Sequence, residues 1–185
     1  DFKKGRLIVQ EMVDLLVYDL IEKDLVTASI TLHIGYDKDG LKESHYRGGV
    51  HIDHFGRAVP KPAHGTEKLT DAGGQAIYSH STKKIMNAVL KLYDRIIDRK
   101  LMLRRVSLTF NDVESAVARK VICRQVSMFT EDVLEQEQED QEQRIQQALF
   151  RIKQKYGNNA VFKGMNLQEG ATTMERNNQI GGHKA

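Results

Sequence analysis

The sequence has few of the features that cross-link a chain, anchor it in a membrane or direct it out of the cell. Cys123 is the only cysteine among the 185 residues, so an internal disulfide cannot form, which is typical of a reducing cytosol. No run of about eighteen apolar residues is present, and the first residues lack the apolar core of a signal peptide. We therefore expect a cytoplasmic protein with no membrane partner.

Proline is scarce too, and its placement marks one irregular segment. Pro60 and Pro62 are the only prolines, and both lie in residues 56–80 together with several glycines. Because proline and glycine interrupt regular structure, we expect a long loop there, stiffened around the two prolines.

Length and charge predict one domain with a polar extension. Of the 185 residues, 40% are hydrophobic and 29% are charged, which is enough for one ordinary core. The net charge is only +3 because acids and bases are separated: residues 131–142 contain seven acids and no lysine or arginine. The preceding part is therefore more basic than the total suggests. The chain begins with Asp1 and not with methionine, so we expect it to be a piece of a longer protein.

The rest of the sequence is arranged around residues 81–110, where a helix leads directly into a strand. Ser81 or Thr82 can cap the helix, because a hydroxyl accepts a hydrogen bond from an amide of the first turn. The apolar stripe of the helix consists of Ile85, Met86, Val89, Leu90, Tyr93, Ile96 and Ile97. From Met102 onward the period changes to two. The residues expected to face the core are Val106, Leu108 and Phe110, and those expected to face away are Leu103, Arg105, Ser107 and Thr109.

Two further elements precede this unit. Apolar residues at helical spacing predict a helix over residues 6–23, and residues 27–36 alternate as a strand with one wet side. The inner face of that strand is Ala28, Ile30, Leu32, Ile34 and Tyr36, and its outer face is Thr27, Ser29, Thr31 and His33. Residues 37–40 predict a turn and residues 46–55 a second strand, so we expect an antiparallel hairpin.

This order of elements predicts an α+β fold over residues 1–112, in which two helices cover one face of an antiparallel sheet. The other face is expected to be small, polar and cationic. Between Lys83 and Arg105 there are eight lysines or arginines against only two acids, Asp94 and Asp98. Such a face suits a polyanion better than a small substrate. The alternative is that these arginines only solvate an exposed face.

The sequence changes character after the last predicted strand. Residues 113–130 predict a connector and residues 131–162 a helical extension, whose helix ends near Gly157 and is followed by a short strand at residues 160–162. Residues 163–185 predict a flexible tail, or one held by something outside the chain. The acidic run is either a solvated helix face or a DNA mimic that competes for the basic sheet.

Several segments resemble one protein family. Residues 103–110 (LRRVSLTF), with the amphipathic helix before them, and the hairpin predicted within residues 29–55 resemble the little finger domain of Y-family translesion DNA polymerases. Residues 152–160 (IKQKYGNNA), 163–166 (KGMN) and 175–185 (ERNNQIGGHKA) are similar to the C-terminus of bacterial UmuC-type, UvrX-like members. The resemblance covers essentially the whole chain, and its ending is the most specific part.

The resemblance implies a DNA-binding role in repair of DNA damage and the SOS response. In that family the little finger lies across the duplex and holds the DNA backbone with its sheet face and an arginine-bearing last strand. Arg104 and Arg105 match the arginine pair, but strand alternation places Arg104 on the inner side. The DNA-binding residues expected from the resemblance and the strand faces are Arg104, Arg105, Ser107, Thr109, Ser29, Thr31 and His33. The implied partner is duplex or primer–template DNA, held without reading of its bases.

The pentapeptide that begins at Gln125 resembles the clamp-binding peptide by which bacterial polymerases attach to the sliding clamp. A glutamine amide can pair with backbone groups, and Met128 and Phe129 each contribute about 1.5–3 kcal/mol if fully buried in a partner groove. The expected clamp-binding residues are Gln125, Ser127, Met128 and Phe129. The alternative is that the last two pack back onto their own domain.

Two departures from the family pattern limit what this chain is expected to do. The little finger of the family opens with a strand that has no counterpart here, so the sheet should have an open edge through which copies self-associate. The palm, fingers and thumb have no counterpart either, and in this family carboxylates of the palm hold the catalytic Mg²⁺. We therefore expect no DNA synthesis and no cofactor in this chain, with Mg²⁺ in the palm of a parent DNA-directed DNA polymerase.

Two other functions fit the same sequence. One is a protein-interaction module whose main partner is the sliding clamp, with incidental contact to DNA. The other is a free-standing nucleic-acid-binding α+β domain. Sheets that bind RNA usually stack bases on exposed aromatic rings, whereas the outer strand faces here offer only His33 and His51, which argues against such stacking.

No motif predicts a catalytic or metal site. His51 and His54 have His45 and His64 nearby, but strand alternation places the first two on opposite faces, which does not suit zinc. Nothing in the spacing places a base beside Cys123, so a structural or exposed thiol is expected there.

Overall fold

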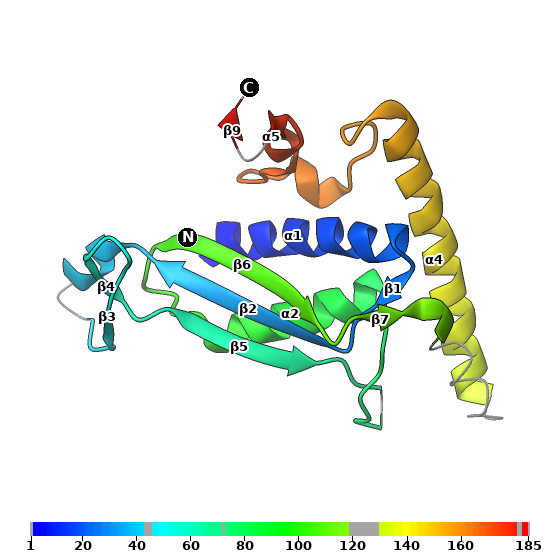
Figure 1. Cartoon of the computed structure of the whole chain (residues 1–185), viewed down its shortest axis with the longest axis horizontal. Coiled ribbons are helices and arrows are strands. Elements are labelled where there is room, and N and C mark those ends of the chain that lie inside the picture. The colour runs from blue at the N-terminus through cyan, green and yellow to red at the C-terminus, as the bar shows by residue number, and fades with distance from the viewer. Residues whose placement is uncertain (1, 43–45, 72, 119–129, 181–182, 185) are drawn as a thin grey trace.

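The computed structural model describes residues 2–42, 46–71, 73–118, 130–180 and 183–184, and it confirms an α+β fold (Figure 1). In chain order the elements are α1 (Phe2–Glu22), β1 (Leu25–Val26), β2 (Ser29–Tyr36), the 3-10 helix η1 (Lys38–Lys42), β3 (Val50–Ile52), β4 (Ala58–Pro60), β5 (Ala63–Lys68), α2 (Thr82–Ile96), β6 (Leu103–Asn111), β7 (Glu114–Ser115), α4 (Thr130–Tyr156), the 3-10 helix η2 (Gly164–Leu167), α5 (Thr173–Asn177), β8 (Gln179–Ile180) and β9 (His183–Lys184). The first part of the chain thus combines two α-helices with antiparallel strands, and helices dominate the second part.

A three-stranded antiparallel sheet of order β5–β2–β6 forms the centre of the molecule. Its middle strand alternates as predicted: Ile30, Leu32 and Ile34 are fully buried, whereas His33 is exposed. Both α1 and α2 pack on the face that the buried residues form, and in Figure 1 α2 lies behind the sheet. The opposite face is left without a helix in the part of the chain that the structure describes.

Helix α2 forms as its sequence period predicts. Ser81 caps the helix, and its Oγ accepts a hydrogen bond from the Lys84 amide at 3.3 Å. Ile85, Val89 and Tyr93 of the apolar stripe are fully buried, and so is Leu92, which the predicted stripe did not include. Since each such side chain contributes about 1.5–3 kcal/mol when buried, this stripe is the main attachment of α2 to the sheet.

Helix α1 confirms the helix predicted over residues 6–23 and begins slightly earlier, at Phe2. A valine on each of three successive turns faces the core: Val9, Val13 and Val17. Gly5 lets the first turn approach β6 and α2 closely, because a Cβ there would lie 2.2 Å from Leu103 Cδ1 and 2.5 Å from Tyr93 Oη. A larger residue at this position would push the helix away from the sheet.

The strand that pairs with β2 is not the predicted one. Residues 46–55 contribute only β3, which pairs with β4 in a separate small sheet. On this side β2 pairs with β5, which lies inside residues 56–80, so the predicted hairpin and the predicted long loop are both wrong. Strand β5 lacks large apolar inward side chains because α2 packs directly over Gly65, where a Cβ would lie 2.9 Å from Leu92 Cδ1. The apolar contact over this strand therefore comes from α2, and the strand's own residues show no apolar alternation.

A β-bulge near the start of β6 changes which residues face outward. Gly35 lies opposite Arg105 and Tyr36 opposite Leu103, so Arg104 is the extra residue. Alternation continued through this point places Arg104 inward and Leu103 outward, and this prediction is wrong. Leu103 packs against the core instead, and both arginines are exposed.

The C-terminal part folds back onto α1. Helix α4 ends where predicted, with Gly157 adopting a φ of 95°. The short strand predicted at residues 160–162 does not form. Residues 163–173, expected to be flexible or held by something outside the chain, are held by Glu11 and Asp14 of α1. Figure 1 shows η2 and α5 along that helix.

Helix α4 is joined to the start of α2 by an acidic side chain. Glu142 accepts a hydrogen bond from Ser81 Oγ at 2.7 Å and another from the Lys83 amide at 3.1 Å, and one turn later Gln146 donates to Thr82 Oγ1. A carboxylate is favourable at this place because the first amides of a helix lack intrahelical partners. Although α4 spans 27 residues, neither it nor any other described helix is apolar enough to cross a membrane.

Candidate nucleic-acid interface

The helix-free face of the central sheet carries polar side chains. On β5, β2 and β6 the residues that point outward are His64, Thr66, Lys68, Thr31, His33, Arg105, Ser107, Thr109 and Asn111. We call this set the open face, and none of its members is acidic. A surface that carries Lys68 and Arg105 beside hydroxyl and amide donors matches a sugar–phosphate backbone, so the open face is the candidate interface.

Hydrogen bonds between side chains fix part of the open face. The Thr31 and Thr66 hydroxyl oxygens lie 2.8 Å apart across β2 and β5, and Asn111 Nδ2 donates to Thr31 Oγ1 at 2.9 Å. The strand register places Thr109 directly opposite Thr31. A row of hydroxyl and amide groups therefore crosses all three strands in a fixed geometry.

Five of the seven predicted DNA-binding residues share the open face: Arg105, Ser107, Thr109, Thr31 and His33. Ser29 does not, because it is only 4% exposed and its Oγ donates to Asp112 Oδ2 at 2.8 Å. Its neighbour Thr27 is fully buried as well and donates to the Asn111 carbonyl at 2.6 Å. The residues at the end of β6 thus cover the start of β2, and the expectation that Ser29 is available to DNA is wrong.

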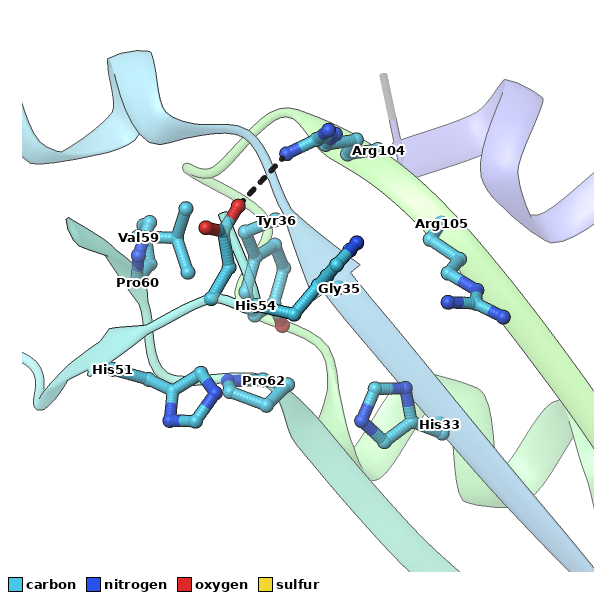
Figure 2. Close-up of a pocket in the computed structure, with 11 residues that line it drawn as sticks. His33, Gly35, Tyr36, His51, His54, Val59, Pro60, Pro62, Arg104 and Arg105 are labelled. Carbon is cyan, nitrogen blue, oxygen red and sulfur yellow. Dashed lines mark ion pairs between the residues drawn. The ribbon is translucent and has the colours of Figure 1, made fainter. Parts of the chain in front are cut away.

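Arg104 is exposed but already paired. The bulge leaves 41% of its side chain exposed, and its Nη1 lies 3.6 Å from Asp53 Oδ2 in the turn after β3 (Figure 2). Asp53 also accepts a bond from Arg57 Nη2 at 2.7 Å and bonds from the Arg57 and Phe55 amides. The Arg57 side chain and these amides, acting against the effect of burial, lower the pKa of Asp53 to about 2. Arg104 therefore ties β6 to an ionised carboxylate of the β3–β4 hairpin.

A groove of about 380 Å³ lies between this hairpin and the end of the open face. The imidazole rings of His33, His51 and His54 line it, together with Pro62 and Arg105. Figure 2 shows His51 beside Pro62, while Arg105 lies on β6 at the other side of the groove. The groove therefore places ring surfaces next to a cationic edge of the open face.

Sequence reasoning missed the parts of this site that come from β5 and from the hairpin turn. His64, Thr66 and Lys68 fall in the stretch predicted as a loop. They alternate with Ala63, Gly65 and Glu67, so no bulky apolar residue marks the inner face of this strand in the sequence. Asp53 was missed because its contact with Arg104 joins two segments that lie far apart in the sequence.

Several predicted features lie outside the residues that the structure describes. The clamp-binding peptide and Cys123 fall in residues 119–129, and His45 falls in residues 43–45. The clamp-binding residues concerned are Gln125, Ser127, Met128 and Phe129. Within the described ranges, no group of three or more His, Cys, Asp or Glu side chains is placed to hold a metal ion.

Comparisons with known proteins found no match: no family model, no curated protein and no solved structure is similar to this chain. The chemistry of the open face and of the groove, together with the motifs in the sequence, therefore carries the functional inference.

Proposed function

We propose that the open face grips the backbone of duplex DNA without reading its sequence. The observation that supports this most directly is the lack of acidic side chains among the outward residues of β5, β2 and β6, while both helices pack behind the sheet. Lys68 and Arg105 lie on the two outer strands, so positive charge spans the width of the sheet. Phosphates accept bonds from such groups at any base sequence, and binding of this kind is strongly salt-dependent.

We propose further that this grip serves a bacterial translesion DNA polymerase. The support is the resemblance of residues 103–110 and of the C-terminal segments to UmuC-type members of the Y family. In this role the chain holds a damaged primer–template in register, and residues 125–129 tether the parent polymerase to the sliding clamp. Nucleotide addition and Mg²⁺ belong to a palm that has no counterpart in this sequence.

Replacing Arg105 with alanine tests the electrostatic grip. If about three or four phosphates are neutralised, the slope of log K against log salt should be about −3. Arg105→Ala should flatten this slope by about one unit and lower the affinity evenly across DNA sequences. Fluorescence anisotropy, with duplexes of unrelated sequence titrated over a salt series, measures both quantities.

Arg95 provides the matched control because it carries the same charge on α2, behind the sheet. Its Nη2 lies 2.7 Å from Glu67 Oε2 on the surface, a pair whose loss should cost little stability. Arg95→Ala should leave the salt slope unchanged. Equal loss of affinity at high and low salt for Arg105→Ala, or equal flattening by both variants, contradicts the proposal.

A further inference from the structure

The groove between the β3–β4 hairpin and the sheet differs in chemistry from the open face. The open face presents mainly hydroxyl, amide and cationic groups, whereas the groove gathers rings: the imidazoles of His33, His51 and His54 and the pyrrolidine of Pro62. In Figure 2 His51 lies next to Pro62, and His33 faces them across the groove. These rings come from β2, from β3, from the turn after β3 and from the segment between β4 and β5. Only the folded chain brings them together.

The wall of the groove that the hairpin forms is held in place before any ligand binds. Asp53 closes the turn by accepting bonds from the Arg57 amide and guanidinium, and Arg104 of β6 ties that turn to the sheet. The base of the hairpin is fixed as well, since the Lys61 amide donates to the Gly49 carbonyl at 2.8 Å. A site that is already ordered loses less entropy when it binds.

The size and charge of the groove suit one nucleotide. Its volume of about 380 Å³ lies toward the lower end of the range for small-molecule sites. Arg105 is exposed at its edge and makes no ion pair with any residue that the structure describes. Asp53, the carboxylate of the groove, already faces two arginines, so its charge is largely offset.

From these observations we infer that the groove binds one unpaired nucleotide beside a duplex that lies on the open face. The base packs against the rings of His51 and Pro62, and its phosphate lies at Arg105. Histidine rings stack on unpaired bases, and an arginine fork matches the oxygens of a phosphate. This inference rests on the proposed DNA binding and narrows it, because the preferred ligand becomes a duplex with a single-stranded extension.

Binding to matched DNAs tests the inference. The full chain is titrated against a blunt duplex, against the same duplex with an extension of a few unpaired nucleotides, and against that extension built from abasic sugar–phosphates. The abasic extension keeps the charge and removes the bases. We expect about tenfold tighter binding to the base-bearing extension than to the abasic one, the size of effect typical of one stacked base.

Two histidine variants distinguish DNA binding in the groove from DNA binding on the open face. His51 lines the groove, whereas His64 lies on the open face outside it, and both side chains are exposed. His51→Ala should reduce the preference for the base-bearing extension to about twofold or less. His64→Ala should weaken binding to all three DNAs together and keep that preference. Circular dichroism and thermal melting check that both variants are folded.

The other outcomes identify which statement fails. Equal affinity for blunt and extended duplexes overturns the inference and leaves the proposed function in place. Equal binding of the abasic and base-bearing extensions overturns the base-stacking site and leaves only a phosphate site. A preference for bases that persists in His51→Ala overturns the placement of the base at His51. Binding to extended DNA without binding to the blunt duplex supports the groove site and contradicts the proposed function. Binding to none of the three contradicts both.

Discussion

Two polar clusters of this molecule differ in burial and in how their hydrogen bonds are satisfied. The carboxylate of Glu11 is fully buried on α1 and accepts bonds from the Thr172 amide and hydroxyl, both at 2.8 Å, from the Thr173 amide at 3.1 Å and from Asn166 Nδ2 at 3.3 Å. The open face is the reverse case. Its side chains are exposed or half-buried, and Arg105 forms no ion pair within the described ranges.

This difference distinguishes polar side chains that stabilise the fold from polar side chains that are available to a ligand. A buried carboxylate is tolerated only when hydrogen bonds replace the water that it loses, and the C-terminal segment supplies those bonds to Glu11. Beside it, Lys163 Nζ donates to Asp14 at 2.8 Å. Exposed cations contribute little to stability. The placement of Lys68 and Arg105 on a face without outward acids is therefore not explained by folding, and this favours a role in binding.

The largest expected effect comes from Glu11→Ala. The truncation leaves the amides of Thr172 and Thr173 without their acceptor, and Asn166 Nδ2 keeps only its bond to Thr173 Oγ1. We expect a loss of about 3 kcal/mol in the free energy of unfolding, measured by chemical denaturation. Proteolysis after Lys163 should become faster, because the C-terminal segment detaches from α1.

Glu11→Gln keeps the shape of the side chain and one acceptor oxygen, so an intermediate loss of stability is expected. Neither variant should change the DNA affinity of the folded protein. If Glu11→Ala weakens DNA binding as much as Arg105→Ala does, the two clusters are coupled and the distinction between them does not hold.

A negative charge introduced on the open face should have the next largest effect, a loss of DNA affinity. Thr109 is exposed on β6, opposite Thr31. Thr109→Glu should lower duplex affinity about fivefold to tenfold at about 0.1 M salt. Stability should change by less than about 1 kcal/mol, because the site is exposed. Thr109→Gln has nearly the same size without the charge and should bind nearly as wild type; an equal loss in both variants points to steric hindrance and not to charge.

Mild acid should loosen the Glu11 cluster by less than truncation does, because a protonated carboxyl still fills its site. Burial raises the pKa of Glu11, but hydrogen bonds from Thr172, Thr173 and Asn166 outweigh it, so the pKa lies below its usual 4.5. A carboxyl whose pKa is lowered by folding stabilises the fold above the pKa of the unfolded chain. That contribution is lost as the pH falls from about 4.5 through the folded value. Denaturation midpoints between about pH 6 and pH 3 measure it.

Asp14 acts in the opposite direction and provides the control. Burial raises the pKa of Asp14 in spite of the contact with Lys163, so the folded chain holds this proton more readily than the unfolded chain does. Acid therefore does not destabilise the fold through Asp14. The loss of stability in acid should shrink in Glu11→Gln and persist in Asp14→Asn. An undiminished loss in Glu11→Gln assigns the acid sensitivity to other carboxylates.

The elements that could be predicted from the sequence are those whose own residues carry their packing. Ile30, Leu32 and Ile34 mark the inner face of β2 without reference to any other segment. Strand β5 could not be found in this way, because its inward Gly65 takes its apolar contact from α2. The bulge at Arg104 could not be predicted either, because the register of β6 is set by its pairing with β2 and not by its own sequence period.

The candidate site was predictable to the same extent. Alternation alone placed Arg105 and Thr109 on the open face, but it could not show that the end of β6 covers Ser29. The groove draws its rings from separate segments and has no signature along the chain. The C-terminal segment looked flexible by composition, although Glu11, an acid among the apolar residues of α1, was a signal that some other segment would satisfy it. Only the fold shows that residues 163–173 do so.

The hydrogen bonds from Ser81 and Lys83 to Glu142 have a practical consequence for dissecting this protein. A chain shortened to end after β6 keeps every outward side chain of the open face. It loses the acceptor that braces the first turn of α2, and it loses the donors that satisfy Glu11. DNA titrations with such a fragment would report the lower stability of its fold as well as the affinity of the open face. The residues before and after the end of β6 therefore have to be studied in one chain.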